Sequence, residues 1–197
     1  MFLLHAPSAK DIERFVAASR ELHLSYGPVG LVSQAPPGFS VDEQTTTIGS
    51  GEAAFERATA ALDSWRHFDL GWVEMFPKQA STAPGSVVVV AVRHLGFWSL
   101  NGCRVIYTVG GPGETTYGFA YGTLTNHAES GEEIFQVSLE PESGDVLYRI
   151  RAVSRPRAAL ARLGYSLTRS LQARFRRDSA RALRRAIAGG DAGAGAI

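Results

Sequence analysis

The stretch GFAYGTLTNHAESGEE, residues 118–133, combines a strand pattern with the densest group of polar side chains in the chain. Its first half alternates aromatic and small residues, which predicts a β-strand. Gly118 and Gly122 indicate close backbone approach or a bulge in that strand. The second half predicts the loop that leaves the strand. It holds a histidine and three glutamates within seven residues, namely His127, Glu129, Glu132 and Glu133.

Strand-like periodicity extends over a larger region, from Gly71 to Val153. Turn sequences rich in glycine and proline separate the strands, and no helical pattern lies between them. This succession predicts an antiparallel meander. The predicted strands are Gly71–Phe76, Ser86–His94, Cys103–Val109, Thr115–Leu124, Glu132–Leu139 and Val146–Val153.

Helical spacing of apolar residues precedes the strand region. It predicts helices over Ser8–Leu24 and Ser50–Trp65, each with its first serine as N-cap. Three glycines and three prolines between Tyr26 and Phe39 predict irregular chain there. The threonine-rich segment Val41–Ile48 predicts a short edge strand.

A long C-terminal helix is predicted to follow the sheet, with Ser154 as N-cap, Pro156 in the first turn and a kink at Gly164. One apolar stripe runs along it, formed by Leu160, Leu163, Leu167, Leu171, Phe175, Ala182 and Ala186. A helix of this length with one apolar face must cover a large sheet or a partner.

These elements predict an α+β fold, in which a curved antiparallel sheet of about six to seven strands wraps around the long C-terminal helix. This is the helix-grip arrangement, and its element order resembles the START-like (SRPBCC) superfamily. We expect a single domain over residues 1–188, with a helical and irregular extension at 1–40 and a flexible tail at 189–197. The gap between a curved sheet and its helix is a common ligand site, of roughly 300–1,000 Å³.

Composition indicates an ordinary globular protein, with 197 residues of which 45% are hydrophobic and 20% charged. No apolar run approaches the ~20 residues that span a bilayer, and no signal-peptide pattern opens the chain, so we expect a cytoplasmic location. Cys103 is the sole cysteine, which excludes an internal disulfide and a cysteine-based zinc cluster. Residues 1–148 carry 8 Lys and Arg against 17 Asp and Glu, whereas residues 149–197 carry 12 Arg against 2 Asp.

Four segments contain long and unusual motifs: GSGEAAFERATAALDSWRHFDLGW, VRHLGFWSLNGCRVIY, YGFAYGTLTNHAESGEE and AVSRPRAALARLGYSLTRSLQARFRRDSARAL. Together they resemble the uncharacterised protein family numbered 0548, found in bacteria and plants, over about Gly49–Leu183. The resemblance implies a link to the START-like superfamily. It implies no activity or substrate, and no cofactor is expected.

The histidine and glutamates after the central strand are the candidate catalytic residues. His127 with Glu129 or Glu132 could act as acid and base. Imidazole and carboxylate are also ligands for zinc or manganese, but the spacing matches no established metal motif, and we expect no metal. Glu132 and Glu133 point to opposite faces of a strand, so at most one of them faces a cavity. The alternative is a solvent-facing hairpin whose glutamates pair with arginine.

A second set of residues is predicted to bind a ligand: Arg93, His94, Trp98, Arg104, Tyr121, Thr123 and His127. Arg93 could hold a ligand carboxylate or phosphate, or could instead pair with Glu74 or Glu133. Trp98 is predicted to lie in the turn after the valine-rich strand, where its ring would be buried. Arg149 and Arg151 share a strand face, either paired with Glu133 or Glu140 or lining an anion-binding cavity.

Three functions remain open at this point. The first is binding of a small, largely apolar molecule, with or without one anionic group, between the sheet and the C-terminal helix. The second is an enzyme in the same cavity, of the cyclase, hydrolase or isomerase type. The third is an interaction module whose arginine-rich helix binds RNA, an anionic membrane or a protein. Nucleic acid is the less favoured partner because that helix offers only Tyr165 and Phe175 for base stacking.

Overall fold

The computed structural model describes residues 1–94, 96–157 and 165–188. The strands are β1 (Phe2–Leu3), β2 (Ser40–Ser50), β3 (Val73–Phe76), β4 (Val87–His94), β5 (Phe97–Gly110), β6 (Thr116–Thr123), β7 (Glu129–Leu139) and β8 (Asp145–Pro156). The helices are α1 (Ala9–Arg20), α2 (Glu52–Asp63), the short 3-10 helix η1 (Arg66–Phe68) and α4 (Tyr165–Ala188).

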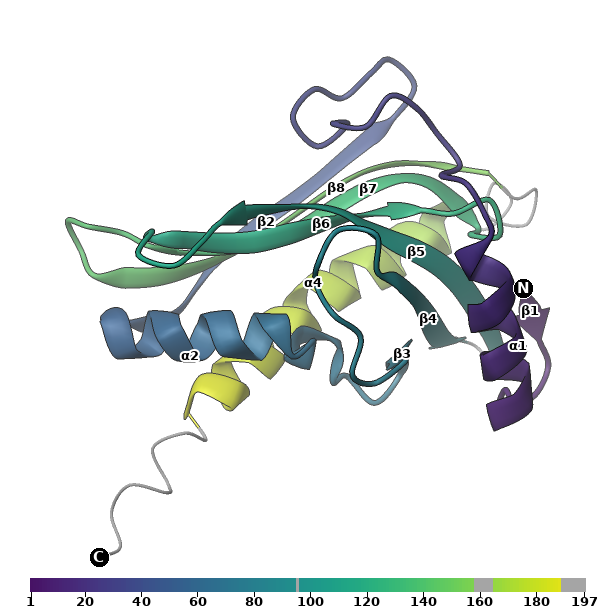
Figure 1. Cartoon of the computed structure of the whole chain (residues 1–197), viewed down its shortest axis with the longest axis horizontal. Helices are drawn as coiled ribbons and strands as arrows, with labels where there is room; N and C mark the ends of the chain where they lie inside the picture. The colour runs from purple at the N-terminus through teal and green to yellow at the C-terminus, as the bar shows by residue number, and fades with distance from the viewer. Residues whose placement is uncertain (95, 158–164, 189–197) are drawn as a thin grey trace, which may run out of the picture.

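One curved antiparallel sheet organises the protein, in the order β2-β8-β7-β6-β5-β4-β3, with β1 paired to β5. Helices α2 and α4 lie on its concave side, whereas the segment between α1 and β2 lies on the convex side (Figure 1). The α+β helix-grip fold predicted from the element order is therefore confirmed.

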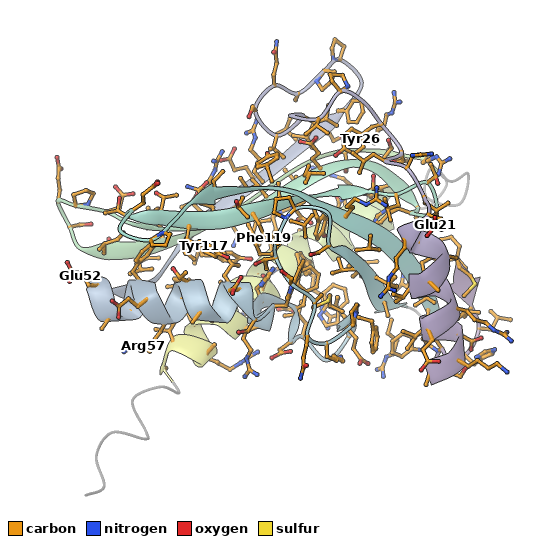
Figure 2. All side chains as sticks on the ribbon, in the orientation of Figure 1. Glu21, Tyr26, Glu52, Arg57, Tyr117 and Phe119 are labelled. Carbon is orange, nitrogen blue, oxygen red and sulfur yellow. The ribbon has the colours of Figure 1, made fainter. Side chains whose placement is uncertain are left out.

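Alternation along the strands divides the core between the two faces. Concave-face residues such as Phe119, Phe135 and Tyr148 pack against α2, η1 and α4. Convex-face residues such as Ala120 and Ile134 pack against the segment that contains Leu31 and Val32, and α1 covers β4 and β5. Figure 2 shows Tyr117 and Phe119 toward α2, and Tyr26 on the other side of the sheet.

The glycines of the central strand lie where other segments of the chain approach its backbone closely, as predicted. A Cβ on Gly118 would lie 2.4 Å from the carbonyl oxygen of Phe135 on β7. A Cβ on Gly122 would lie 2.1 Å from the Tyr26 hydroxyl, which belongs to the convex-side segment. Glycine at these positions lets β7 and that segment pack directly against β6.

Several predicted boundaries are wrong, chiefly because β7 and β8 form a longer hairpin than expected. Ser154 and Pro156 do not begin a helix, because they pair with Gly131 and Glu129 in the sheet. The start of the C-terminal stripe (Leu160, Leu163), the Gly164 kink and the tail at 189–197 lie outside the described residues. None of the described helices combines the length and apolar character that a membrane-spanning helix needs.

Two further local predictions are corrected. Ser50 is the last residue of β2 and not a helix cap, because Gly51, at φ 80°, is the N-cap of α2. Phe97 and Trp98 do not lie in a turn, since they begin β5 and pair with His94 and Arg93 of β4. The Ser8 N-cap of α1 is confirmed by its hydrogen bond from the Asp11 backbone N–H, in a complete capping box.

Candidate functional site

A cavity of about 690 Å³ lies between the concave face of the sheet and α4, with β1 at its edge. Its lining is mostly apolar and includes Phe68, Trp72, Val73, Val90, Val92, Phe97, Leu171 and Phe175, with Phe2, Leu3 and Leu4 from the N-terminus. Small residues also line it, among them Gly131 and Ala152 of the sheet and Ala128 of the loop before β7. The other end of the concave face is filled by aromatic rings such as Trp65 and Phe119, whose centroids are 4.7 Å apart.

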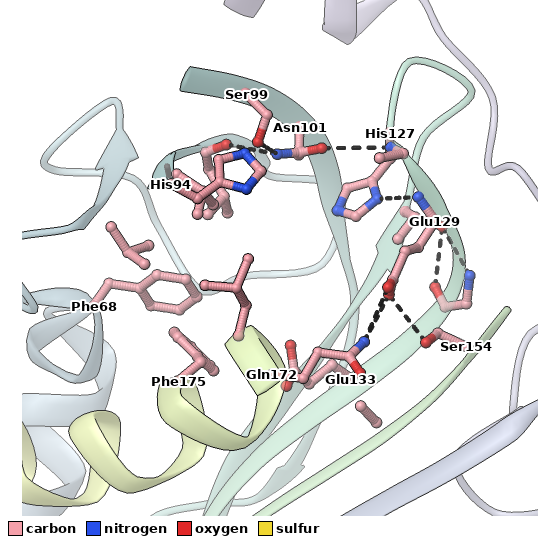
Figure 3. A pocket seen from close by; sticks show the side chains of 18 of the residues that line it. Phe68, His94, Ser99, Asn101, His127, Glu129, Glu133, Ser154, Gln172 and Phe175 are labelled. Atoms are coloured by element: carbon pink, nitrogen blue, oxygen red, sulfur yellow. Dashed lines mark hydrogen bonds between the residues drawn. The ribbon is translucent and has the colours of Figure 1, made fainter. Parts of the chain in front are cut away.

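Polar groups gather on the part of the wall formed by β7 and the loop before it (Figure 3). The backbone N–H of Glu129 donates to Nδ1 of His127 at 2.9 Å. Because Nδ1 accepts this bond, the proton of the neutral imidazole is on Nε2. The Nε2–H is therefore available as a hydrogen-bond donor. Burial lowers the pKa of His127 to about 4, and the ring is therefore neutral at pH 7.

The Glu129 carboxylate is anchored to two other elements. It accepts hydrogen bonds from Ser154 Oγ of β8 at 3.0 Å and from Gln172 Nε2 of α4 at 2.9 and 3.0 Å. Burial raises the pKa of this carboxyl, against the opposing effect of those two donors. Glu129 thus connects the sheet hairpin to the C-terminal helix at the cavity.

Glu133 supplies a second carboxyl on the same face. Its Oε2 accepts a hydrogen bond from the Tyr121 hydroxyl at 2.7 Å, and the two residues are direct cross-strand partners. Its other oxygen has no hydrogen-bond partner among the described residues. Burial, reinforced by the nearby Glu129 charge, raises the pKa of Glu133 to about 7. This carboxyl can therefore exchange a proton near neutral pH.

His94 lines the opposite part of the cavity, where its ring lies 4.2 Å from that of Phe97 between centroids. Both ring nitrogens are buried and have no hydrogen-bond partner among the described residues. Burial lowers the pKa of this histidine. Nearby, the Asn101 side-chain amide is fixed by Ser99 Oγ at 3.1 Å and by the Ala128 N–H at 3.4 Å.

The structure places six of the candidate residues at the cavity, which are His94, Tyr121, Thr123, His127, Glu129 and Glu132. Thr123 is occupied by the neighbouring strand, because its hydroxyl accepts from the Gly131 N–H at 2.9 Å. Tyr121 is occupied by Glu133, and its own pKa is raised well above the usual value by burial.

The other candidates lie elsewhere. Arg93 is exposed, and Trp98 packs with Phe15 and Val16 of α1 on the convex side. Arg104 donates to the carbonyl oxygens of Arg20 and Leu22, at 2.9 and 3.0 Å, and so fixes the end of α1.

The carboxylate of Glu132 is turned away from the cavity. Its two oxygens accept from the backbone N–H groups of Gly30 and Val32, at 2.8 and 3.2 Å. These amides belong to the convex-side segment, so the carboxylate of Glu132 is bound there although the residue also borders the cavity. Alternation along the strand predicts that at most one of these two glutamates faces a cavity; the inner one is Glu133 and not Glu132, the predicted acid or base.

An ion-pair cluster joins α4 to the edge strand beside the cavity. Asp42 of β2 is paired with Arg176 at 3.2 Å and also with Arg169. On the convex side, Arg149 and Arg151 share a face as predicted, but both bind Glu43 of β2 instead of Glu133 or Glu140. No three His, Cys, Asp or Glu residues in the described ranges are grouped so that they could hold a metal ion.

Sequence comparison gives a family match. The family model described as a domain of unknown function (DUF1990) matches residues 25–182. A UPF0548 protein of Dictyostelium discoideum is 33% identical over 207 residues, covering 95% of this chain and 96% of the relative. A UPF0548 protein of Deinococcus radiodurans is 37% identical over 199 residues, covering 94% and 98%.

Among solved structures, the Zhui aromatase/cyclase of Streptomyces sp. R1128 is similar in fold, with a TM-score of 0.54 and 14% sequence identity. The match covers 81% of this chain and 99% of the cyclase. At this identity the likeness concerns the fold.

Proposed function

This chain belongs to the DUF1990 family of domains of unknown function, and we propose that it binds one small, largely apolar molecule in the cavity between the sheet and α4. The observation that carries the proposal is the cavity itself, which has about 690 Å³ of space, a mostly apolar lining and polar groups concentrated on a few elements. Ligand pockets have this volume and this distribution of polar groups.

Two features of the cavity support the binding of a ligand there. Unfilled apolar space in a protein core destabilises the folded state, because the lining atoms lose packing contacts. The buried, unpartnered nitrogens of His94 add a further cost, since buried polar groups are normally hydrogen-bonded. A ligand with an apolar body and a polar group near His94 would remove both penalties.

A second candidate function is acid–base catalysis in the same cavity. It is favoured by the Tyr121–Glu133 pair, because a carboxyl with a pKa near 7 is suited to donate and accept protons at neutral pH. In this version Glu133 replaces Glu132 as the titrating group, and the Nε2–H of His127 would donate to a developing oxyanion.

The interaction module receives less support from the geometry, because many arginines of α4 make internal contacts. Arg169 and Arg176 bind Asp42, and Arg174 lies over the Trp72 ring at 4.4 Å from its centroid. Arg184 donates to the carbonyl oxygen of Thr47, at 3.0 Å from its Nε.

Native mass spectrometry of the protein purified from the cells that make it tests the binding proposal. We expect a retained adduct of a few hundred daltons in the wild type. Its matched control is Ala152→Phe, because Ala152 lines the cavity beside Glu133 and a phenyl group there occupies ligand space. An adduct kept unchanged by Ala152→Phe, or no adduct and no thermal stabilisation by any compound of a metabolite library, would refute the proposal.

A further inference from the structure

The charges around the cavity are unequally balanced. Among the described residues, the charged residues that line it are Glu129, Glu132, Glu133 and Arg176. Glu132 directs its carboxylate to the convex side, where two backbone amides bind it. The groups that decide the cavity's charge are therefore two carboxyls and one guanidinium.

The guanidinium of Arg176 is engaged by Asp42, although Asp42 is shared with Arg169 and one positive charge of the three groups stays uncompensated. It lies 3.2 Å from Asp42, and the side chains of these residues are only 12% and 6% exposed. An anionic ligand would have to displace a buried aspartate to reach it, which would leave that carboxylate uncompensated. Arg169 is the second partner of Asp42 and is likewise engaged.

The other basic groups that the structure describes near the cavity do not provide a free cation. His94 and His127 both have lowered pKa values because of burial, so their rings are neutral at pH 7. The amino group of Met1 donates to the Leu100 carbonyl oxygen at 2.8 Å and is not part of the lining. Arg93, the residue expected to hold an anion, lies outside the cavity and is exposed.

Resting on the proposed binding function, we propose that the ligand is an apolar molecule bearing a protonated amine, and that Glu133, with Glu129 behind it, binds the ammonium group. The free Oε1 of Glu133 is an acceptor that the described residues leave unused, whereas its Oε2 is held by Tyr121. A carboxylate in an apolar cavity is stabilised by an opposite charge and by donated hydrogen bonds. An ammonium group supplies both, and a ligand carboxylate supplies neither.

Binding of an amine would be coupled to loss of a proton. The charged and titratable groups that act on Glu133 come from six elements: Asp42, Cys103, Tyr121, Glu129, Tyr148 and Arg176. Their combined effect with burial leaves Glu133 partly protonated at pH 7 in the empty cavity. The incoming ammonium keeps its proton, the Glu133 carboxyl releases its own to solvent, and an ion pair forms.

Three probes of eight carbons each, with different polar ends, test this inference: octylamine, octanol and octanoate, measured by isothermal titration calorimetry with the full chain. At pH 8 we expect octylamine to bind at least tenfold more tightly than octanoate, with octanol between them. Because alkylammonium stays charged at both pH values while Glu133 must ionise, octylamine affinity should fall about tenfold between pH 8 and pH 6. Octanol affinity should not change.

The variant Glu133→Gln keeps an acceptor for Tyr121 but removes the charge. It should reduce octylamine affinity at pH 8 about tenfold and leave octanol affinity unchanged. Glu140→Gln is the matched control, since Glu140 follows β7 and is exposed. Asp42→Asn, which removes the counter-charge of Arg176, should raise octanoate affinity.

The outcomes separate the two proposals. If none of the three probes binds while a retained ligand of another kind is found, the amine inference fails and the binding function stands. Equal or tighter binding of octanoate than of octylamine to the wild type also overturns the amine inference. No binding of any probe and no retained ligand would overturn both.

Discussion

Glu132 and Glu133 are adjacent in β7 and have opposite environments. Glu132 faces the convex side, where both of its carboxylate oxygens accept backbone N–H bonds and the residue is only 2% exposed. Glu133 faces the concave side, where one oxygen is bound by Tyr121 and the pKa is raised to about 7. Alternation of side chains along one strand produces this difference.

The carboxylate of Glu132 stabilises the fold, whereas the buried carboxyl of Glu133 destabilises it when ionised. The bonds to Gly30 and Val32 attach the irregular convex-side segment to the centre of the sheet. The burial of Glu133, by contrast, disfavours its charged form and opposes folding at high pH. A costly titratable group at a cavity is a candidate functional residue on physical grounds.

The largest effect is expected when Glu132 is removed. Glu132→Ala leaves two backbone N–H groups without their charged acceptor, and hydrogen bonds to charged groups contribute roughly 1.5–3 kcal/mol each. We expect a loss of about 4 kcal/mol in the free energy of unfolding, measured by urea denaturation. Octanol binding to the folded variant should be unchanged. A loss below about 1 kcal/mol would show that Glu132 does not hold the segment.

The next effect is a change in pH dependence with Glu133→Gln. In the wild type the folded-state pKa of about 7 exceeds the ordinary value of 4.5, so the folded state binds more protons between these values. Stability is therefore lost as pH rises through this window, by about 2.5 kcal/mol between pH 5 and pH 8. The free energy of unfolding of Glu133→Gln minus that of the wild type should therefore increase by this amount when the pH is raised from 5 to 8. A pH-independent difference would contradict the assignment.

A smaller effect is expected from filling the concave side. Ala152→Phe should weaken octanol binding at least tenfold, about 1.4 kcal/mol, because the ring occupies the cavity. Since Ala152 borders a cavity and not closely packed side chains, the free energy of unfolding should change by less than about 1 kcal/mol, unlike overpacking of a filled core. The matched substitution Ala120→Phe on the convex face, where Ala120 is fully buried, should instead prevent stable folding. If both variants folded equally well, the two faces of the sheet would not differ in packing and the prediction would be wrong.

The smallest effect is expected on the outer side of α4. Arg177 and Arg185 are exposed, in contrast to Arg176, which is paired with Asp42. The double substitution Arg177→Ser and Arg185→Ser should change unfolding free energy and octylamine affinity by less than about 0.5 kcal/mol, as is usual for surface positions. Retention of the wild type on heparin or anionic vesicles, lost in this variant, would revive the interaction module.

Much of the fold could be predicted, because strand alternation, turn residues and helical spacing are local properties. The absolute face of a strand was harder to assign. In β4 both faces are buried, with Val88 and Val90 on one side and Val89 and Ala91 on the other. The pattern of such a strand does not show which face Arg93 is on. The faces of Trp98 and Arg104 on the neighbouring strand are then undetermined for the same reason.

The position of Glu133 could have been found from the sequence. Phe135 and Val137 are large and apolar, whereas Gln136 and Ser138 between them are polar, so the odd-numbered residues of this strand face the core. Extending that parity back by two residues places Glu133 inside. The partnership of Asp42 with Arg176 could not be predicted, because it joins an edge strand to a helix over a large sequence separation.

The central claim is that Glu133 lies in a largely apolar cavity and has no ion-paired cation of its own among the described residues. Carbon-13 NMR titration of its carboxyl carbon, assigned with Glu133→Gln, measures this directly. We predict a pKa of about 7 in the free protein and a clearly lower pKa when octylamine is bound. A pKa near the ordinary 4.5 in the free protein, unchanged by octylamine, would mean that the carboxyl is in water and would contradict the claim.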